Sequence, residues 1–135
     1  MYDPVLIQPF RDELVRAGFV ELRAPQDVDK ACVQKGTVLL VINSVCGCAA
    51  GSARPGVRLA LAHPKRPEHL VTVFAGQDRE ATNQARAHIP YPPSSPAIAL
   101  FRDGHLVFVM HRSDIEGRPP EAIAAVLDKA FEQFC

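Results

Sequence analysis

Apolar residues recur at helical spacing near both ends of the chain. Leu6, Phe10 and Leu14 follow Asp3-Pro4, which is typical of an N-cap with proline at the first helical position. A last helix is predicted to start at Pro119-Pro120. Its apolar positions fall on one stripe: Ile123, Val126, Leu127, Ala130, Phe131 and Phe134. This stripe fits either a core or a dimer seam, so a homodimer stays an open expectation.

Between these helices the pattern changes to a buried strand. A short helix is predicted over residues 26–33, and the run 37–43 has no polar alternation, which indicates a strand covered on both faces. A helical stretch is then expected to extend to about His63, with a kink near Pro55.

The second half of the chain predicts a strand, a helix and a hairpin. Residues 71–74 are predicted to form a second strand, and Asp78 is expected to cap the helix that follows. The runs 97–101 and 106–110 flank Asp103-Gly104, which is a strong hairpin signal.

The order of these elements predicts the fold class. From residue 37 it is strand–helix–strand–helix–strand–strand–helix, so two crossovers give a parallel pair and the hairpin adds an antiparallel pair. We expect an α/β, thioredoxin-like fold: a central mixed sheet flanked by helices on both faces, with an N-terminal helical extension. At 135 residues, the chain is predicted to form a single domain over residues 1–135.

Composition and charge narrow the classes of partner. The chain is 47% hydrophobic and 22% charged, and its 15 Lys+Arg balance 15 Asp+Glu. Zero net charge argues against broad capture of nucleic acid or of an anionic membrane. No apolar stretch approaches the roughly 20 residues that span a bilayer, and the first residues lack the features of a secretory signal. We therefore expect a cytoplasmic protein, with no nucleic-acid or membrane partner, whose cysteines are catalytic, redox-sensing or metal-binding rather than structural disulfides.

The candidate chemistry is the string Cys46-Gly47-Cys48 at the junction of a strand and a helix. Backbone N–H groups and the helix dipole at such a junction lower the pKa of a thiol and make it a nucleophile. Residues i and i+2 of a helix do not face each other, so a disulfide in this motif needs the non-helical geometry that Gly47 permits. Cys46 is predicted to attack. Either another thiol or Cys48 then releases the captured group.

Other cysteine roles are weighed against this one. Cys46 and Cys48 alone are conceivable ligands of a metal or iron–sulfur carrier, although a structural zinc site needs four ligands and no further Cys/His spacing supplies them. A non-catalytic thioredoxin-like interaction module is the other alternative. Cys32 is predicted to be a buried hydrophobe, and the role of Cys135 stays open.

Residues outside the motif complete the predicted site. Pro96, just before the hairpin, is the candidate cis-proline that faces the thiol in thioredoxin-like proteins. The backbone of Ser95 is then placed to pair with an extended substrate. Arg54 and Arg58 are expected to be solvated, and Arg112 is a possible cation near the site.

Several strings resemble the bacilliredoxin family of thioredoxin-like proteins. They are Asn43 to Gly51 with Ala53-Arg54-Pro55, Val71 to Asp78 with Glu80-Ala81-Thr82, Ser94-Ser95-Pro96, Ile115-Glu116-Gly117 and Cys135. The resemblance implies a thiol–disulfide oxidoreductase that reduces mixed disulfides between protein cysteines and bacillithiol. It implies that Cys46 accepts bacillithiol, that Cys48 is the second catalytic cysteine, and that Pro96, Ser95 and Gly47 contact the substrate. No metal or cofactor is expected, with bacillithiol as co-substrate and bacillithiolated client proteins as partners.

Overall fold

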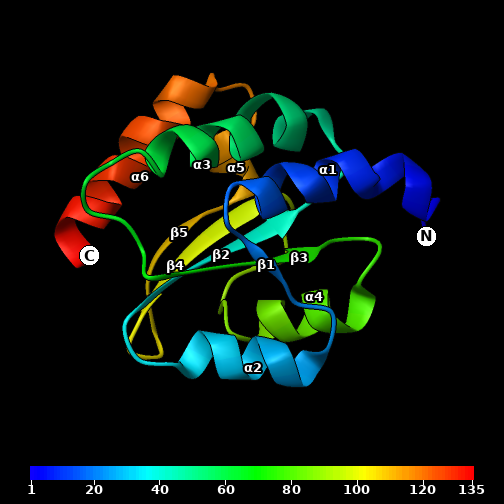
Figure 1. Cartoon of the computed structure of the whole chain (residues 1–135), viewed down its shortest axis with the longest axis horizontal. Helices are drawn as coiled ribbons and strands as arrows, with labels where there is room; N and C mark the ends of the chain where they lie inside the picture. Colours follow the sequence, from blue (N-terminus) through cyan, green and yellow to red (C-terminus); the bar gives the residue numbers. More distant parts are fainter.

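A five-stranded mixed sheet lies between two layers of helices in the computed structural model, which describes residues 1–135 (Figure 1). The strand order is β1-β3-β2-β4-β5. The strands are β1 (Val20–Glu21), β2 (Thr37–Asn43), β3 (His69–Phe74), β4 (Ala97–Arg102) and β5 (His105–Met110). The predicted α/β, thioredoxin-like architecture is confirmed. The sequence pattern missed β1, because a two-residue strand has too few positions to show a period.

Strand β2 is the centre of the sheet, and all seven of its residues are buried. It runs parallel to β3, with Ile42 beside Val73, and antiparallel to β4, with Ile42 beside Ala97. Because β2 and β4 are antiparallel neighbours, the last residue of β2 and the first residue of β4 lie at the same end of the sheet. The segments around Cys46 and Pro96 therefore meet at one end of the sheet.

The helices divide between the two faces (Figure 1). On one face lie α1 (Pro4–Arg16), α3 (Arg54–Ala60), α5 (Arg112–Ile115) and α6 (Pro120–Phe134); on the other lie α2 (Pro25–Val33) and α4 (Arg79–Ala87). Alternate residues of β2 supply both cores, with Leu39 and Val41 in the first and Val38 and Leu40 in the second. Leu127 and other members of the α6 stripe pack in the first core.

The predicted first helix is confirmed, and its contacts correct one expectation. The Asp3 carboxylate accepts the N–H of Val5 at 2.9 Å, as an N-cap should. Asp78 stands at the N-cap position of α4, but its side chain makes no capping hydrogen bond. Its two carboxylate oxygens instead accept hydrogen bonds from the guanidinium of Arg11 at 2.9 and 3.0 Å. The same guanidinium also pairs with Glu21. Asp78 therefore joins α1 to the sheet, because a buried arginine needs this partner more than the helix end does.

The helix after β2 is irregular where the cysteine motif leads into it. Residues Ala49–Ala53 form a π-helical turn, α3 follows directly, and the helix ends at Ala60 rather than near His63. Gly56 packs tightly against α6: a Cβ added there would lie 2.6 Å from the Cβ of Ile123. None of the helices combines the length and the hydropathy needed to cross a membrane.

Candidate active site

The two motif cysteines lie where β2 gives way to the helix. The carbonyl oxygen of Cys46 accepts the N–H of Ala49 at 3.1 Å and of Ala50 at 3.2 Å, so the first helical turn begins at this residue. Cys46 and Cys48 are half-buried, Gly47 between them is exposed, and both thiols are free. This is the junction that the sequence pattern predicted.

The surroundings of Cys46 favour its thiolate. Partial burial opposes ionisation, but a hydrogen bond from the Ser44 hydroxyl, the backbone N–H groups of Ala49 and Cys48, and the positive charge of Arg112 together lower the pKa of Cys46. Ser44 is itself fixed, since its oxygen accepts the N–H of Cys46 at 3.1 Å. Cys46 is thus a partly accessible thiol with the electrostatics of a nucleophile.

Cys48 has the opposite electrostatics. Burial and the nearby charge of Cys46 raise its pKa, and Glu116 adds to the effect. Its Sγ lies 3.8 Å from Oε2 of Glu116, to which the thiol donates a weak hydrogen bond. The pKa values of the two motif thiols are therefore shifted in opposite directions, down for Cys46 and up for Cys48.

Arg112 connects the thiols to the loop that precedes β4. Its Nε donates to Oε2 of Glu116 at 3.0 Å, and its Nη1 donates to the carbonyl oxygen of Ser95 at 3.3 Å. The carboxylate of Glu116, followed by the charges of Cys46 and Cys48, raises the pKa of Arg112. Glu116 is a site residue that the sequence pattern did not assign. The available signal was its spacing of four residues from Arg112, typical of an ion pair on a helix.

The three predicted substrate-contact residues lie at this end of the sheet. The Ser95–Pro96 peptide bond is cis, as the resemblance implied, and Pro96 is buried. Ser95 is half-buried, and its carbonyl oxygen already accepts the hydrogen bond from Arg112. A Cβ added at Gly47 would meet no atom within 4 Å, so the surface between the two cysteines is open to an approaching molecule.

Arg54 corrects the expectation that it is solvated, since only 1% of its surface is exposed. Its Nη1 donates to Oδ1 of Asn43 at 2.9 Å and to the carbonyl oxygen of Ser44 at 2.8 Å. Its Nε donates to Glu13 at 2.8 Å, and its guanidinium lies 4.8 Å from the ring centre of Phe10. Arg54 is buried because the end of β2 presents oxygens that need a donor, so it holds the segment that carries Ser44.

The remaining cysteines lie apart from the motif. Cys32 is fully buried, as predicted, and burial together with the charge of Asp29 raises its pKa to about 12. Cys135 is half-buried, and burial raises its pKa as well. No three His, Cys, Asp or Glu side chains come together in a way that would hold a metal ion.

Solved structures with the same arrangement of strands and helices are thioredoxin-like. A protein with a thioredoxin fold superposes with a TM-score of 0.68 at 16% identity, covering 85% of this chain and 95% of that one. Thioredoxin from Halobacterium salinarum gives a TM-score of 0.59 at 18% identity, covering 87% of this chain and 91% of that one. The fold is therefore that of thioredoxin.

The related sequences belong to the class of protein that the two thiols indicate. A family model described as disulphide isomerase matches residues 2–135. A bacilliredoxin of Cytophaga hutchinsonii is 54% identical over 135 residues, covering 99% of this chain and 100% of the relative. A bacilliredoxin of Geobacillus kaustophilus is 53% identical over 131 residues, covering 96% of this chain and 90% of the relative.

Fold, relatives and thiol pair together define a thiol–disulfide oxidoreductase. Identities at this level over nearly the whole chain place it more closely: the chain belongs to the bacilliredoxin family.

Proposed function

We propose that this protein reduces mixed disulfides between bacillithiol and the cysteines of client proteins, with Cys46 as the nucleophile. The observation that carries the proposal is the position of Cys46, a half-buried free thiol at the first turn of a helix. The lowered pKa of Cys46 and the raised pKa of Cys48 agree with it. The membership of the bacilliredoxin family supports bacillithiol as the thiol that is removed.

In the first step the Cys46 thiolate attacks the bacillithiol sulfur of the mixed disulfide. A bond forms between Cys46 and bacillithiol, the bond between bacillithiol and the client breaks, and the client cysteine leaves as a thiolate that takes a proton from water. Cys46 is suited to this step because its hydrogen bonds favour the ionised form, which is the attacking species. Open space around Gly47 gives a client protein access to the sulfur.

In the second step a thiol attacks one of the two sulfurs of the Cys46–bacillithiol disulfide. Cys48 would attack the Cys46 sulfur and expel bacillithiol, whereas a second bacillithiol would attack the bacillithiol sulfur and expel Cys46. If Cys48 attacks, it loses its proton, a Cys46–Cys48 disulfide forms, and an external thiol must later reduce it. If a second bacillithiol attacks, bacillithiol disulfide is released and Cys46 returns directly to its thiolate. The raised pKa of Cys48 supports Cys46, rather than Cys48, as the thiol that makes the first attack.

Mass spectrometry tests the proposal directly. The Cys48→Ala variant, incubated with bacillithiol disulfide, is expected to gain one bacillithiol on Cys46, whereas the Cys46→Ala variant gains none. The Cys135→Ala variant is the matched control, because it removes a half-buried thiol outside the motif. Absence of an adduct on Cys46 in a folded protein that still reacts with a neutral disulfide would refute bacillithiol as the substrate.

A further inference from the structure

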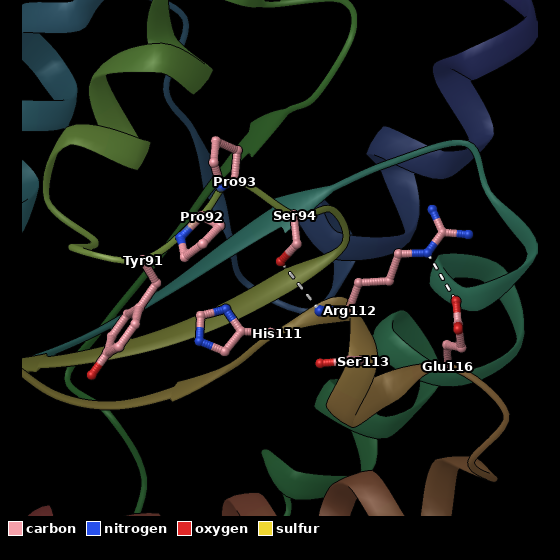
Figure 2. A pocket seen from close by; sticks show the side chains of 8 residues that line it. All are labelled: Tyr91, Pro92, Pro93, Ser94, His111, Arg112, Ser113 and Glu116. Carbon is pink, nitrogen blue, oxygen red and sulfur yellow. Dashed lines mark hydrogen bonds and ion pairs between the residues drawn. The ribbon is translucent and has the colours of Figure 1, made fainter.

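An open pocket of about 520 Å³ is lined in part by Arg112 and Glu116 (Figure 2). Its walls come from the loop at residues 91–94 and from the segment 111–116, which contains α5. A volume of this size is typical of small-molecule sites in proteins, which run from roughly 300 to 1,000 Å³.

The two ends of the pocket differ in chemistry. At one end Tyr91 and His111 form an edge-to-face pair with ring centres 5.0 Å apart, and more than half of Tyr91 is exposed. At the other end Arg112 extends toward Glu116, and the hydroxyl of Ser94 lies between the two ends (Figure 2). The pocket thus offers an aromatic wall, a hydroxyl group and one guanidinium.

Positive charge in this region is only partly paired. Arg112 uses Nε for Glu116 and Nη1 for Ser95, and neither hydrogen bond occupies Nη2. Nη2 of Arg112 is therefore a donor that remains available to the carboxylate of a ligand.

Two residues that line the pocket also neighbour the thiols. Glu116 lines the pocket and accepts the hydrogen bond of Cys48, while Arg112 lines it and lies close enough to Cys46 to affect its ionisation. A small thiol bonded through its sulfur to Cys46 can therefore place the rest of its atoms only a short distance away, in this pocket.

We propose that the pocket binds the non-sulfur portion of a carboxylate-bearing low-molecular-weight thiol, with Arg112 as the partner of the carboxylate and Tyr91 as the wall against which the ligand packs. This inference rests on the proposed function and adds to it a site that selects the thiol by charge. The bound carboxylate takes the free Nη2 of Arg112, so the ion pair with Glu116 is retained.

Rates of adduct formation with disulfides of different charge test the pocket separately from the chemistry. In the Cys48→Ala background, the second-order rate constant on Cys46 is measured with bacillithiol disulfide, which is anionic, and with hydroxyethyl disulfide, which is neutral. The ratio of the two rate constants is the readout. Both reactions use the same thiolate, so a change in the pKa of Cys46 cancels from the ratio to first order.

The Arg112→Gln variant is expected to lower this ratio about tenfold, the size of effect of losing one charge-assisted hydrogen bond. The Tyr91→Ala variant is expected to lower it about threefold, through lost packing of the ligand. Arg23→Gln is the matched control, since Arg23 is an exposed arginine that pairs with Glu21 away from the pocket, and its ratio should not change.

The outcomes separate the two proposals. A ratio that stays constant in both pocket variants, with bacillithiol still captured on Cys46, overturns the pocket and leaves the proposed function standing. A protein that reacts with hydroxyethyl disulfide and never with bacillithiol disulfide overturns both. A preference for the anionic disulfide that weakens with added salt and falls in the Arg112 variant supports the pocket.

Discussion

Replacing Ser44 by alanine removes the one side-chain hydroxyl that stabilises the Cys46 thiolate. Ser44 is buried and its oxygen also accepts the N–H of Cys46, so the hydroxyl is held in place before the thiol ionises. Without it, partial burial of Cys46 is opposed only by backbone N–H groups and by Arg112. The pKa of Cys46 should therefore rise in the Ser44→Ala variant.

The size of the effect follows from the hydrogen bond and from the exposure of the sulfur. A hydrogen bond to a charged group contributes about 1.5–3 kcal/mol. Water can replace part of it at the half-buried Cys46, so we use the lower end, about 1.5 kcal/mol, which reduces the thiolate fraction roughly tenfold below the pKa. A more basic thiolate is also a better nucleophile, by about threefold for a Brønsted coefficient near 0.4–0.5. The net rate at low pH should fall roughly threefold, to about a third of its original value.

The two contributions act differently across the pH range, and this provides the test. Below the pKa values of both proteins the variant should react more slowly than the parent, and above both it should react about threefold faster, because only nucleophilicity then differs. The rate is followed with the neutral disulfide dithiodipyridine in a Cys48→Ala, Cys135→Ala background. Ser113→Ala, which removes an exposed hydroxyl at the pocket, is the control. Rate curves of the variant and the parent that coincide at all pH values would refute the role given to Ser44.

Three further predictions concern stability and accessibility. Gly56→Ala should destabilise the protein by about 1–3 kcal/mol in urea unfolding, because the new Cβ meets Ile123. In the control variant Gly51→Ala the new Cβ meets no atom within 4 Å, so the helix should be stabilised by up to about 1 kcal/mol. Equal effects of the two substitutions would contradict the packing of Gly56 against α6. Arg54→Met should lower the free energy of unfolding by about 3 kcal/mol in the same assay, because three buried or partly buried oxygens lose their donor. An unchanged unfolding midpoint would show that the hydrogen bonds of Arg54 do not stabilise the protein. Cys32, whose pKa is raised to about 12, should resist iodoacetamide at about pH 8 in the folded protein and react in urea, and labelling of the native state would contradict its burial.

The sequence pattern predicted most of the fold because the main elements carry strong periodic signals. Strand β2 is apolar throughout and is buried throughout, and the Asp103-Gly104 turn adopts the positive φ values of 50° and 83° that its residue types allow. The pattern did not predict α5, whose four residues are too few to show a helical period. It also misplaced the function of Asp78, because a local capping signal cannot reveal a buried arginine 67 residues away.

The candidate site was predicted in part, for a similar physical reason. The position of Cys46 after a buried strand indicated an activated thiol without any knowledge of its neighbours. The partners that set its ionisation come from three separate segments: Ser44 on the strand end, backbone N–H groups in the helix, and Arg112 beyond the hairpin. Arg54 was expected in solvent because helical spacing placed it far from the sulfur, whereas its long side chain turns inward to the oxygens of Asn43 and Ser44.

The hydrogen bonds around Cys46 also determine how long a captured molecule can stay attached. A sulfur whose anion is well stabilised departs easily when the bond it has formed is attacked from the other side. When a second bacillithiol attacks the bacillithiol sulfur, Cys46 is the leaving group, so the contacts from Ser44 and from the helix start shorten the lifetime of the covalent intermediate on this route. Below the pKa of Cys46 the same contacts also speed its formation. Release and capture are governed by the same few donors, so the residue is adapted to repeated turnover rather than to permanent storage of a modified thiol.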